Sequence, residues 1–272
     1  MCPPVGLEPI PPYQRSCRWS PGRSRSSSWS GPYDGGVRGV EDYLQQIKRL
    51  EEGGQRCTAT ILAQTLGVSL PSASEMLKRL AEEGYLERAK DGAIHLTTYG
   101  RPLAHMVLRR HRLVERLLTD ILGMPWHEVH RDAHRLEHAI SSRVEEHLAA
   151  ALGYPEYCPH GHPICPVDRR ELRPLDAMAS GERAAVAQIS EISEELLAYL
   201  DQIGIRPATI LTMIEAAPFD GPLTFEGEGG LVTVGREVAA HVRVCDPAQA
   251  GWINNRATGI TGRLGITEPQ PT

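Results

Sequence analysis

The chain has 272 residues, of which 41% are hydrophobic and 23% charged, and its formal net charge is -5. This length allows two or three modest domains, and the core must be mainly aliphatic because only two Phe are present. The negative balance excludes a uniformly basic surface, although a local basic face on an acidic protein is compatible with DNA binding. No apolar run is long enough to span a bilayer, the N-terminal residues show no hydrophobic signal core, and the six cysteines are too scattered for a dense disulfide framework. We therefore expect a cytoplasmic protein.

The two ends of the chain differ in composition from its middle. Residues 1–36 are rich in Pro, Ser, Gly and Arg and show no apolar periodicity. Such a segment cannot bury enough surface to compensate for the loss of chain entropy, so we predict a disordered extension. Residues 246–272 are rich in Gly, Pro and Asn, and we predict a loose tail.

Residues 37–98 begin with two segments of helical periodicity. Apolar residues spaced three and four apart predict helices over 41–52 and 58–66. Gly67 and Val68 then provide a tight turn. The sequence thus predicts two helices followed directly by a turn.

A third helix and a hairpin complete this region. Ser69 is a suitable N-cap for a helix that ends before Gly84. The short alternating runs 85–88 and 94–97 flank the dipeptide Asp91-Gly92, which is a hairpin signal. This order is typical of a winged helix-turn-helix DNA-binding domain, and the alternative is an ordinary helical hairpin with a stray strand pair.

Residues 99–153 are predicted to form a helical domain. One helix covers 99–122, and after a corner at Pro125 and Trp126 a single second helix runs from 127 to 152. Both are apolar enough to pack against each other and against a second subunit, so we expect a homodimer. Residues 154–171 are predicted to form a linker loop rich in Pro, Gly, Cys and His.

Residues 172–245 are predicted to form a small β domain. Short alternating segments are separated by Gly and Pro, and a helix is expected over 193–203. The predicted strands are Ala184–Ile189, Thr209–Glu215, Leu223–Glu226, Leu231–Val234 and Ala239–Val244. The fold class is therefore mainly α with a small C-terminal β-barrel.

The strongest chemical signal lies in the second predicted helix of the middle domain. His130, His134, Glu137 and His138 are spaced three and four apart and therefore share one helical face. Imidazole and carboxylate groups are ligands for first-row transition ions, so this face predicts a metal site. The alternative without metal is a solvated polar stripe.

The same residues allow an enzymatic interpretation. His134, Glu137 and His138 have the form HxxEH, the inverted zinc-protease motif, in which the two His would bind zinc and the Glu would activate water. The motif is short, and the winged-helix pattern upstream argues against a protease domain. A zinc metallopeptidase remains the alternative, less favoured function.

Further candidate ligands lie on both sides of this helix. His111 and Glu115 are four residues apart on the preceding helix. Two Cys and two His fall within the eight residues 158–165, a spacing too tight for all four to reach one tetrahedral ion. We expect Cys158 and His160 to contribute to a shared site.

The order of these motifs resembles the diphtheria toxin repressor family, which includes iron-dependent and manganese-responsive regulators. The similarity spans about residues 37–245 and is carried by 41–44, 110–118, 129–138 and 158–164. The last part is similar to the SH3-like, FeoA-type barrel that ends the longer members. The resemblance implies that the protein is not an enzyme but a metal-dependent repressor of metal-homeostasis genes.

The resemblance also implies two metal ions per subunit. The regulatory site would be formed by Asp42, His134, Glu137 and His138. The second site would be formed by His111, Glu115, His130, Cys158, His160 and a carboxylate from the barrel, for which Glu191 is the first candidate and Glu194 the second. Because Asp42 belongs to the first predicted helix of the DNA-binding domain, the regulatory ion would tie that domain to the dimerisation domain.

The chain departs from the iron-type pattern at two ligand positions. Iron-type members have Met where this chain has Asp42, and Cys where it has His134. Oxygen and imidazole ligands without soft sulfur suit manganese, and also iron(II). His134 differs from the usual manganese-type carboxylate as well. We expect Mn(II) before Fe(II).

The resemblance implies that a homodimer presents two recognition helices to successive major grooves of a pseudo-palindromic operator. Residues near the start of the recognition helix are expected to reach base edges: Ser69, Pro71, Ser72, Ser74 and Glu75. The basic side chains expected to contact phosphates are Lys78, Arg79 and Arg88.

Overall fold

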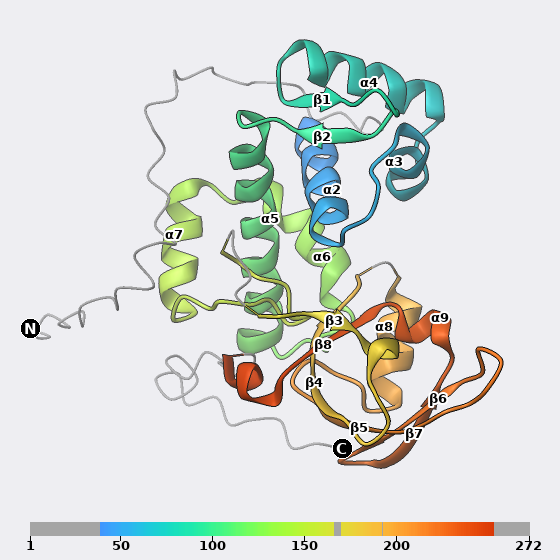
Figure 1. The fold of residues 1–272 in the computed structure, drawn as a ribbon. Coiled ribbons are helices and arrows are strands. Elements are labelled where there is room, and N and C mark those ends of the chain that lie inside the picture. The colour runs from blue at the N-terminus through green and yellow to red at the C-terminus, as the bar shows by residue number, and fades with distance from the viewer. Residues whose placement is uncertain (1–38, 166–169, 192, 253–272) are drawn as a thin grey trace, which may run out of the picture.

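The computed structural model describes residues 39–165, 170–191 and 193–252, so the predicted disordered extension and most of the predicted loose tail lie outside the described residues. Three parts follow one another in the described chain: a small helical part with a hairpin, a group of helices around a long central one, and a β-sheet part (Figure 1). The predicted fold class, mainly α with a small C-terminal β part, is confirmed. Among the described helices none is both long and apolar enough to cross a membrane.

The first part consists of α2 (Val40–Glu52), α3 (Ala59–Leu66), α4 (Leu70–Glu82) and the hairpin of β1 (Leu86–Arg88) with β2 (Ile94–Leu96). The Ser69 hydroxyl accepts a hydrogen bond from the Ser72 amide and caps α4, as the sequence predicts. Gly67, with φ of +64°, makes the left-handed turn between α3 and α4. The apolar faces of these elements close one core, which includes Leu44, Leu62 and Leu77.

The middle part is organised around α5 (Gly100–Arg116), which continues as one π-helical stretch, η1 (Leu117–Ile121). α2 packs along α5, and α6 (Val129–Leu136) and α7 (Ser142–Ala151) also contact it (Figure 1). The helix of the first part that carries Asp42 therefore lies directly beside the helix that carries His111 and Glu115.

The prediction of one continuous helix from 127 to 152 is wrong. α6 ends at Leu136, tightens into a 3-10 turn, η2 (Glu137–Ala139), and stops at Ile140, which has extended backbone angles. Ser141 then begins α7 by accepting a hydrogen bond from the Val144 amide. The apolar spacing continues across this break, and neither Gly nor Pro marks it.

The C-terminal part is an antiparallel sheet with the order β3-β8-β4-β5-β6-β7. Its elements are β3 (Arg173–Pro174), η3 (Leu175–Ala177), β4 (Arg183–Ile189), α8 (Glu194–Gln202), β5 (Ile210–Ala216), β6 (Leu223–Gly227), β7 (Gly230–Val234), α9 (Arg236–Ala239) and β8 (Val242–Cys245). The sheet and α8 enclose a separate core, with Val186, Leu200 and Phe225 fully buried. The last predicted strand begins later than expected because α9 occupies its start. The first residues of the predicted loose tail form a 3-10 helix, η4 (Pro247–Trp252).

Candidate metal centre

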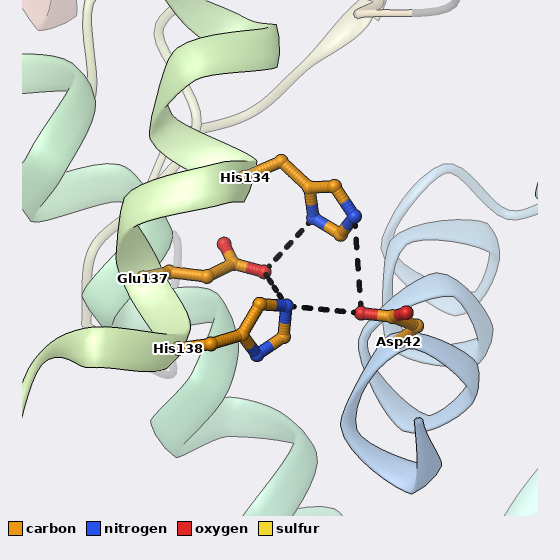
Figure 2. Close-up of side chains that lie close together, drawn as sticks. All are labelled: Asp42, His134, Glu137 and His138. Atoms are coloured by element: carbon orange, nitrogen blue, oxygen red, sulfur yellow. Dashed lines mark hydrogen bonds and ion pairs between the residues drawn. The ribbon is translucent and has the colours of Figure 1, made fainter. Parts of the chain in front are cut away.

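Four side chains gather where α2 meets the end of α6 (Figure 2). This first cluster consists of Asp42 from the first turn of α2, His134 from α6, and Glu137 and His138 from η2. One ligand atom from each lies within 4.8 Å of all the others. Ligands about 2.1 Å from a shared ion lie up to about 4.2 Å apart, so small side-chain movements would bring all four to one ion.

The distances in the first cluster join its members into a closed ring (Figure 2). His138 Nε2 lies 3.1 Å from Asp42 Oδ1 and 3.4 Å from Glu137 Oε1. His134 Nδ1 lies 3.0 Å from Glu137 Oε1, and its Nε2 lies 3.8 Å from Asp42 Oδ1. Oxygen and imidazole atoms without sulfur form a donor set suited to Mn(II), Fe(II) or Zn(II).

Neighbouring charges and hydrogen bonds shift the pKa values of two members of the first cluster in opposite directions. Burial alone would raise the pKa of Glu137, but hydrogen bonds from His111 and His134 outweigh it and lower the pKa to about 2. Hydrogen bonds to Asp42 and Glu41 raise the pKa of His138 to about 10. Without a metal ion, a protonated His138 therefore balances part of the carboxylate charge.

Two residues that support the first cluster were missed by the sequence reasoning. Glu41 Oε2 lies 2.9 Å from His138 Nδ1, on the ring edge opposite Asp42. Gln45 Nε2 donates a 3.0 Å buried hydrogen bond to Glu137 Oε2. Gln45 is three residues after Asp42 and so shares its face of α2, which is the signal that could have identified it.

The second cluster consists of two overlapping groups that share Glu115 and Glu191. One group adds His111 of α5 and His130 of α6, and the other adds Cys158 and His160 of the loop before the sheet. Within each group, ligand atoms of all members lie within 4.8 Å of one another. The members of the second cluster are thus His111, Glu115, His130, Cys158, His160 and Glu191.

Glu115 Oε1 is the centre of the second cluster. It lies 2.9 Å from His111 Nε2, 3.2 Å from His130 Nδ1 and 3.3 Å from His160 Nδ1. Glu191 Oε1 lies 3.3 Å from His160 Nδ1 and 3.8 Å from Cys158 Sγ. Nitrogen, oxygen and sulfur atoms from four separate segments therefore converge here: α5, α6, the loop after α7 and the residues after β4.

Most members of the second cluster are buried, although the His130 side chain is 26% exposed. Burial opposes ionisation of Glu115, but the charges of His111 and His160 outweigh it and hold the pKa of Glu115 well below its ordinary value. Burial and the nearby Glu115 raise the pKa of the Cys158 thiol to about 11. Glu115 Oε2 and His160 Nε2 are buried without a hydrogen-bond partner among the described residues. Buried polar atoms without partners are uncommon, and such atoms here fit a site that would bind a cation or an ordered water.

The backbone holds the loop of the second cluster against β4. The Ile189 amide donates to the His160 carbonyl at 3.0 Å, and His162 Nε2 lies 3.0 Å from the Ile189 carbonyl. Gly161 has φ of +85°, and a Cβ at this position would lie 1.9 Å from the Ala187 carbonyl oxygen. Only glycine allows this approach, which brings His160 beside Glu191.

Of the two carboxylates predicted from the β part, Glu191 joins the second cluster. Glu194 lies in neither described cluster; its half-exposed carboxylate is 3.7 Å from Arg131. Arg49 of α2 was not anticipated, and it forms an ion pair with Glu191. That contact spans 142 residues of sequence.

The residues predicted to contact DNA are concentrated on α4. Ser69, Pro71, Ser72, Glu75, Lys78 and Arg79 are exposed there, Ser74 is half-buried, and Arg88 is exposed on β1. Lys78 Nζ is 3.9 Å from Glu82, and Arg79 Nε is 2.8 Å from Glu83. Apart from Arg88 on β1 and the half-buried Ser74, these side chains are exposed at the start and along the outer face of α4.

Comparison with known proteins matches all three parts. Residues 37–94 match the iron dependent repressor, N-terminal DNA binding domain; residues 97–166 match the iron dependent repressor, metal binding and dimerisation domain; and residues 173–245 match the FeoA domain. Together with the fold and the donor clusters, these matches define a DNA-binding transcriptional regulator that depends on metal.

Its relatives place it more narrowly. The chain is 34% identical over 221 residues to the iron-dependent repressor IdeR of Mycobacterium tuberculosis strain H37Rv, covering 75% of this chain and 96% of the relative. It is 32% identical over 232 residues to the diphtheria toxin repressor of Corynebacterium jeikeium, covering 75% and 95%. A solved manganese-dependent transcriptional repressor in complex with manganese is 36% identical, with a TM-score of 0.71 and coverage of 76% and 99%. The chain belongs to the diphtheria toxin repressor family. Members are DNA-binding repressors rather than enzymes, and none of these matches supports the metallopeptidase alternative.

Proposed function

We propose that this protein represses metal-homeostasis genes in the cytoplasm when a divalent cation fills the first cluster. The observation that carries the proposal is the position of Asp42, which lies on α2 of the DNA-binding part and shares the cluster with three residues of α6 and η2. A cation bound there would supply positive charge shared by Asp42 and Glu137.

The residues of the cluster, bound to one ion, would then link two parts of the chain. Asp42 holds α2, whereas Glu137 and His138 hold η2, so their joint ligation fixes the orientation of α2 relative to α5 and α6. Gln45 and Glu41 support this link, since Gln45 contacts Glu137 and Glu41 contacts His138. Ligand binding can favour the DNA-binding arrangement only by the difference in affinity between the two arrangements.

We propose Mn(II) or Fe(II) as the activating ion, with two ions per subunit. The first cluster offers only oxygen and nitrogen, which favours these ions over those selected by sulfur. The second cluster offers a thiol in addition, but its carboxylates Glu115 and Glu191 keep it suited to the same ions. Relatives of this chain include both iron-dependent and manganese-dependent repressors.

In the proposed complex, a homodimer presents two copies of α4 to successive major grooves of a pseudo-palindromic operator. Ser69, Pro71, Ser72, Ser74 and Glu75 would reach base edges, since they surround the capped N-terminal end of α4. Lys78, Arg79 and Arg88 would contact phosphates.

Operator binding in the presence of separate metal ions tests this function. Fluorescence anisotropy of the purified dimer on its operator, titrated with Mn(II), Fe(II) and Zn(II), should show weak binding after chelation and tight binding with the activating ion. The double variant Glu137→Ala with His138→Ala should lose the response while remaining a folded dimer. Asp132→Ala is the matched control, because Asp132 is on α6 but pairs with Arg135 outside both clusters. Tight operator binding without metal would contradict the proposal.

A further inference from the structure

One helix of the DNA-binding part contacts both clusters with side chains of opposite charge. Asp42 and Arg49 are seven residues apart on α2, which is two helical turns, and therefore share a face. Asp42 joins the first cluster, whereas Arg49 forms an ion pair with Oε2 of Glu191 in the second cluster. The Arg49 side chain is 16% exposed and that of Glu191 is 6% exposed. This contact is shielded from water, so screening weakens it little.

Arg49 compensates charge that the second cluster would otherwise leave buried. Glu115 and Glu191 are two carboxylates with side chains 0% and 6% exposed, and both have atoms within 3.3 Å of the same His160 nitrogen. The imidazoles around them can lose their protons, but a guanidinium stays charged at all ordinary pH values. Glu191 Oε2, which Arg49 contacts, also lies 3.4 Å from His130 Nδ1. The guanidinium thus occupies the side of Glu191 that faces the ligands on α6.

We propose that Arg49 is the resident cation of the second cluster and competes with a divalent ion for Glu191. In the metal-free protein, Arg49 neutralises Glu191 and anchors α2 to the segment after β4. Full ligation of an ion by Oε2 of Glu191 requires Arg49 to withdraw, which releases that anchor. The proposal rests on the proposed function only in taking the second cluster as a metal site.

The direction of the effect follows from electrostatics. Two cations that contact the same carboxylate repel each other, and burial strengthens the repulsion because the effective dielectric constant is low. By reciprocity, if an ion in the second cluster weakens the Arg49 contact, then Arg49 weakens binding of that ion by the same factor. Coupling of this kind is typically about 5- to 150-fold.

Mn(II) binding to full-length protein tests the proposal without any DNA. The EPR signal of free Mn(II) gives stoichiometry and affinity, and a His138→Ala background weakens the first cluster so that the second can be measured separately. Arg49→Met removes the charge and keeps an apolar stem, so Mn(II) should bind to the second cluster at least about fivefold more tightly. Arg49→Lys keeps the charge and should stay close to the unsubstituted background.

The number of Mn(II) ions bound per subunit, and the affinity of the second cluster, decide whether Arg49 competes with the ion. If the unsubstituted protein binds one Mn(II) per subunit and Arg49→Met binds two, Arg49 excludes the second ion and the proposal stands. Equal or weaker second-cluster affinity in Arg49→Met overturns it, because Arg49 would then only position Glu191. If Arg49→Met fails to fold, Arg49→Gln serves in its place. Failure of the proposed function would give a different result. Protein with the native Arg49 would then bind the operator equally well with and without metal.

Discussion

His111 joins the two clusters through one buried imidazole ring. Its Nδ1 lies 2.5 Å from Glu137 Oε2 of the first cluster, and its Nε2 lies 2.9 Å from Glu115 Oε1 of the second. His111 and Glu115 are completely buried, and Glu137 is 1% exposed. A histidine that binds metal through one nitrogen usually donates the proton on the other to a carboxylate or carbonyl. Ligation at Nε2 therefore fixes Nδ1 as a donor to Glu137 and orients that carboxylate.

Substitution of His111 should accordingly weaken the first cluster, although His111 is not one of its members. Loss of an outer hydrogen-bond partner typically costs 10- to 100-fold in metal affinity, so His111→Gln should raise the Mn(II) concentration for half-maximal operator binding by about that factor. Cys158→Ala is the control, because Cys158 belongs to the second cluster but its thiol contacts His160 and Glu191. An equal effect of both variants would show that the second cluster acts as a whole, not through His111.

Gln45 should stabilise the metal-free protein through its buried hydrogen bond to Glu137. Gln45→Leu keeps a similar volume but leaves a buried carboxylate oxygen with one donor fewer, and this should lower the free energy of unfolding by about 1–3 kcal/mol. Urea unfolding in the presence of a chelator measures the effect. Gln46→Leu, one residue further on the same helix and half-buried, should change it much less. Similar losses in the two variants would mean that the Glu137 contact contributes little.

Local sequence signals predicted much of the fold. Periodicity gave α2, α3 and α4 within a few residues, and Ser69 and the Asp91-Gly92 turn marked boundaries that the structure confirms. The failures have physical causes. The break after η2 lacks Gly and Pro and is set by the Ser141 cap, while β3 is only two residues long and exists through pairing with β8.

The donor clusters were predictable from side-chain chemistry and from the order of motifs, but their supporting contacts were not. Glu41 and Gln45 lie 97 and 92 residues from the cluster members that they contact. Arg49 lies 142 residues from Glu191. The face that Gln45 shares with Asp42 is a local signal for Gln45 alone. No periodicity links Arg49 to Glu191, and a basic residue within a predicted metal site runs against the expectation for ligands.

Arg112, which is buried, forms an ion pair with Glu52, whose side chain is 20% exposed, and this pair should make stability depend on pH. Arg112 is 2% exposed and donates 2.6 Å hydrogen bonds to Glu52 Oε2 and to the Pro163 carbonyl, joining α2, α5 and the loop of the second cluster. Glu52→Gln leaves the guanidinium buried without its counter-charge and should cost about 3 kcal/mol of unfolding free energy at pH 7. Glu87→Gln, an exposed substitution on β1, should cost little.

The pH range of this effect follows from the pKa of Glu52. Burial alone would raise it, but Arg112 outweighs burial and lowers it from 4.5 to about 2. A lowered carboxyl pKa stabilises the folded state above the unfolded value, and the stabilisation is lost as pH falls through the folded value. The stability difference between wild type and Glu52→Gln should therefore be full at pH 7, shrink below about pH 4.5 and vanish near pH 2. Denaturant unfolding across this range measures it, and a pH-independent difference would contradict the assignment.

Lys78 and Glu82 should affect DNA binding in opposite directions. The Lys78 ammonium is 3.9 Å from Glu82 on the exposed face of α4, with both side chains largely in solvent. Lys78→Ala should weaken operator and nonspecific DNA alike and reduce the slope of log affinity against log salt by about one. Glu82→Gln removes a nearby negative charge and should strengthen both. Loss of affinity for the operator alone in Lys78→Ala would assign this side chain to a base edge and not to a phosphate.

The break between η2 and α7 can be tested through two adjacent serines. The Ser141 hydroxyl accepts from the Val144 amide and begins α7, whereas the Ser142 hydroxyl only accepts an exposed 3.2 Å hydrogen bond from Arg110. Ser141→Ala should destabilise the protein by about 1 kcal/mol, the usual cost of losing an N-cap, and Ser142→Ala should cost clearly less. α7 is also attached to α5 by the ion pair of Glu145 with Arg110, so the helix should remain formed in both variants. Thermal unfolding of the metal-free dimer measures the difference. Equal costs for the two serines would mean that α6 and α7 join as one continuous helix in solution, as the apolar periodicity alone predicts.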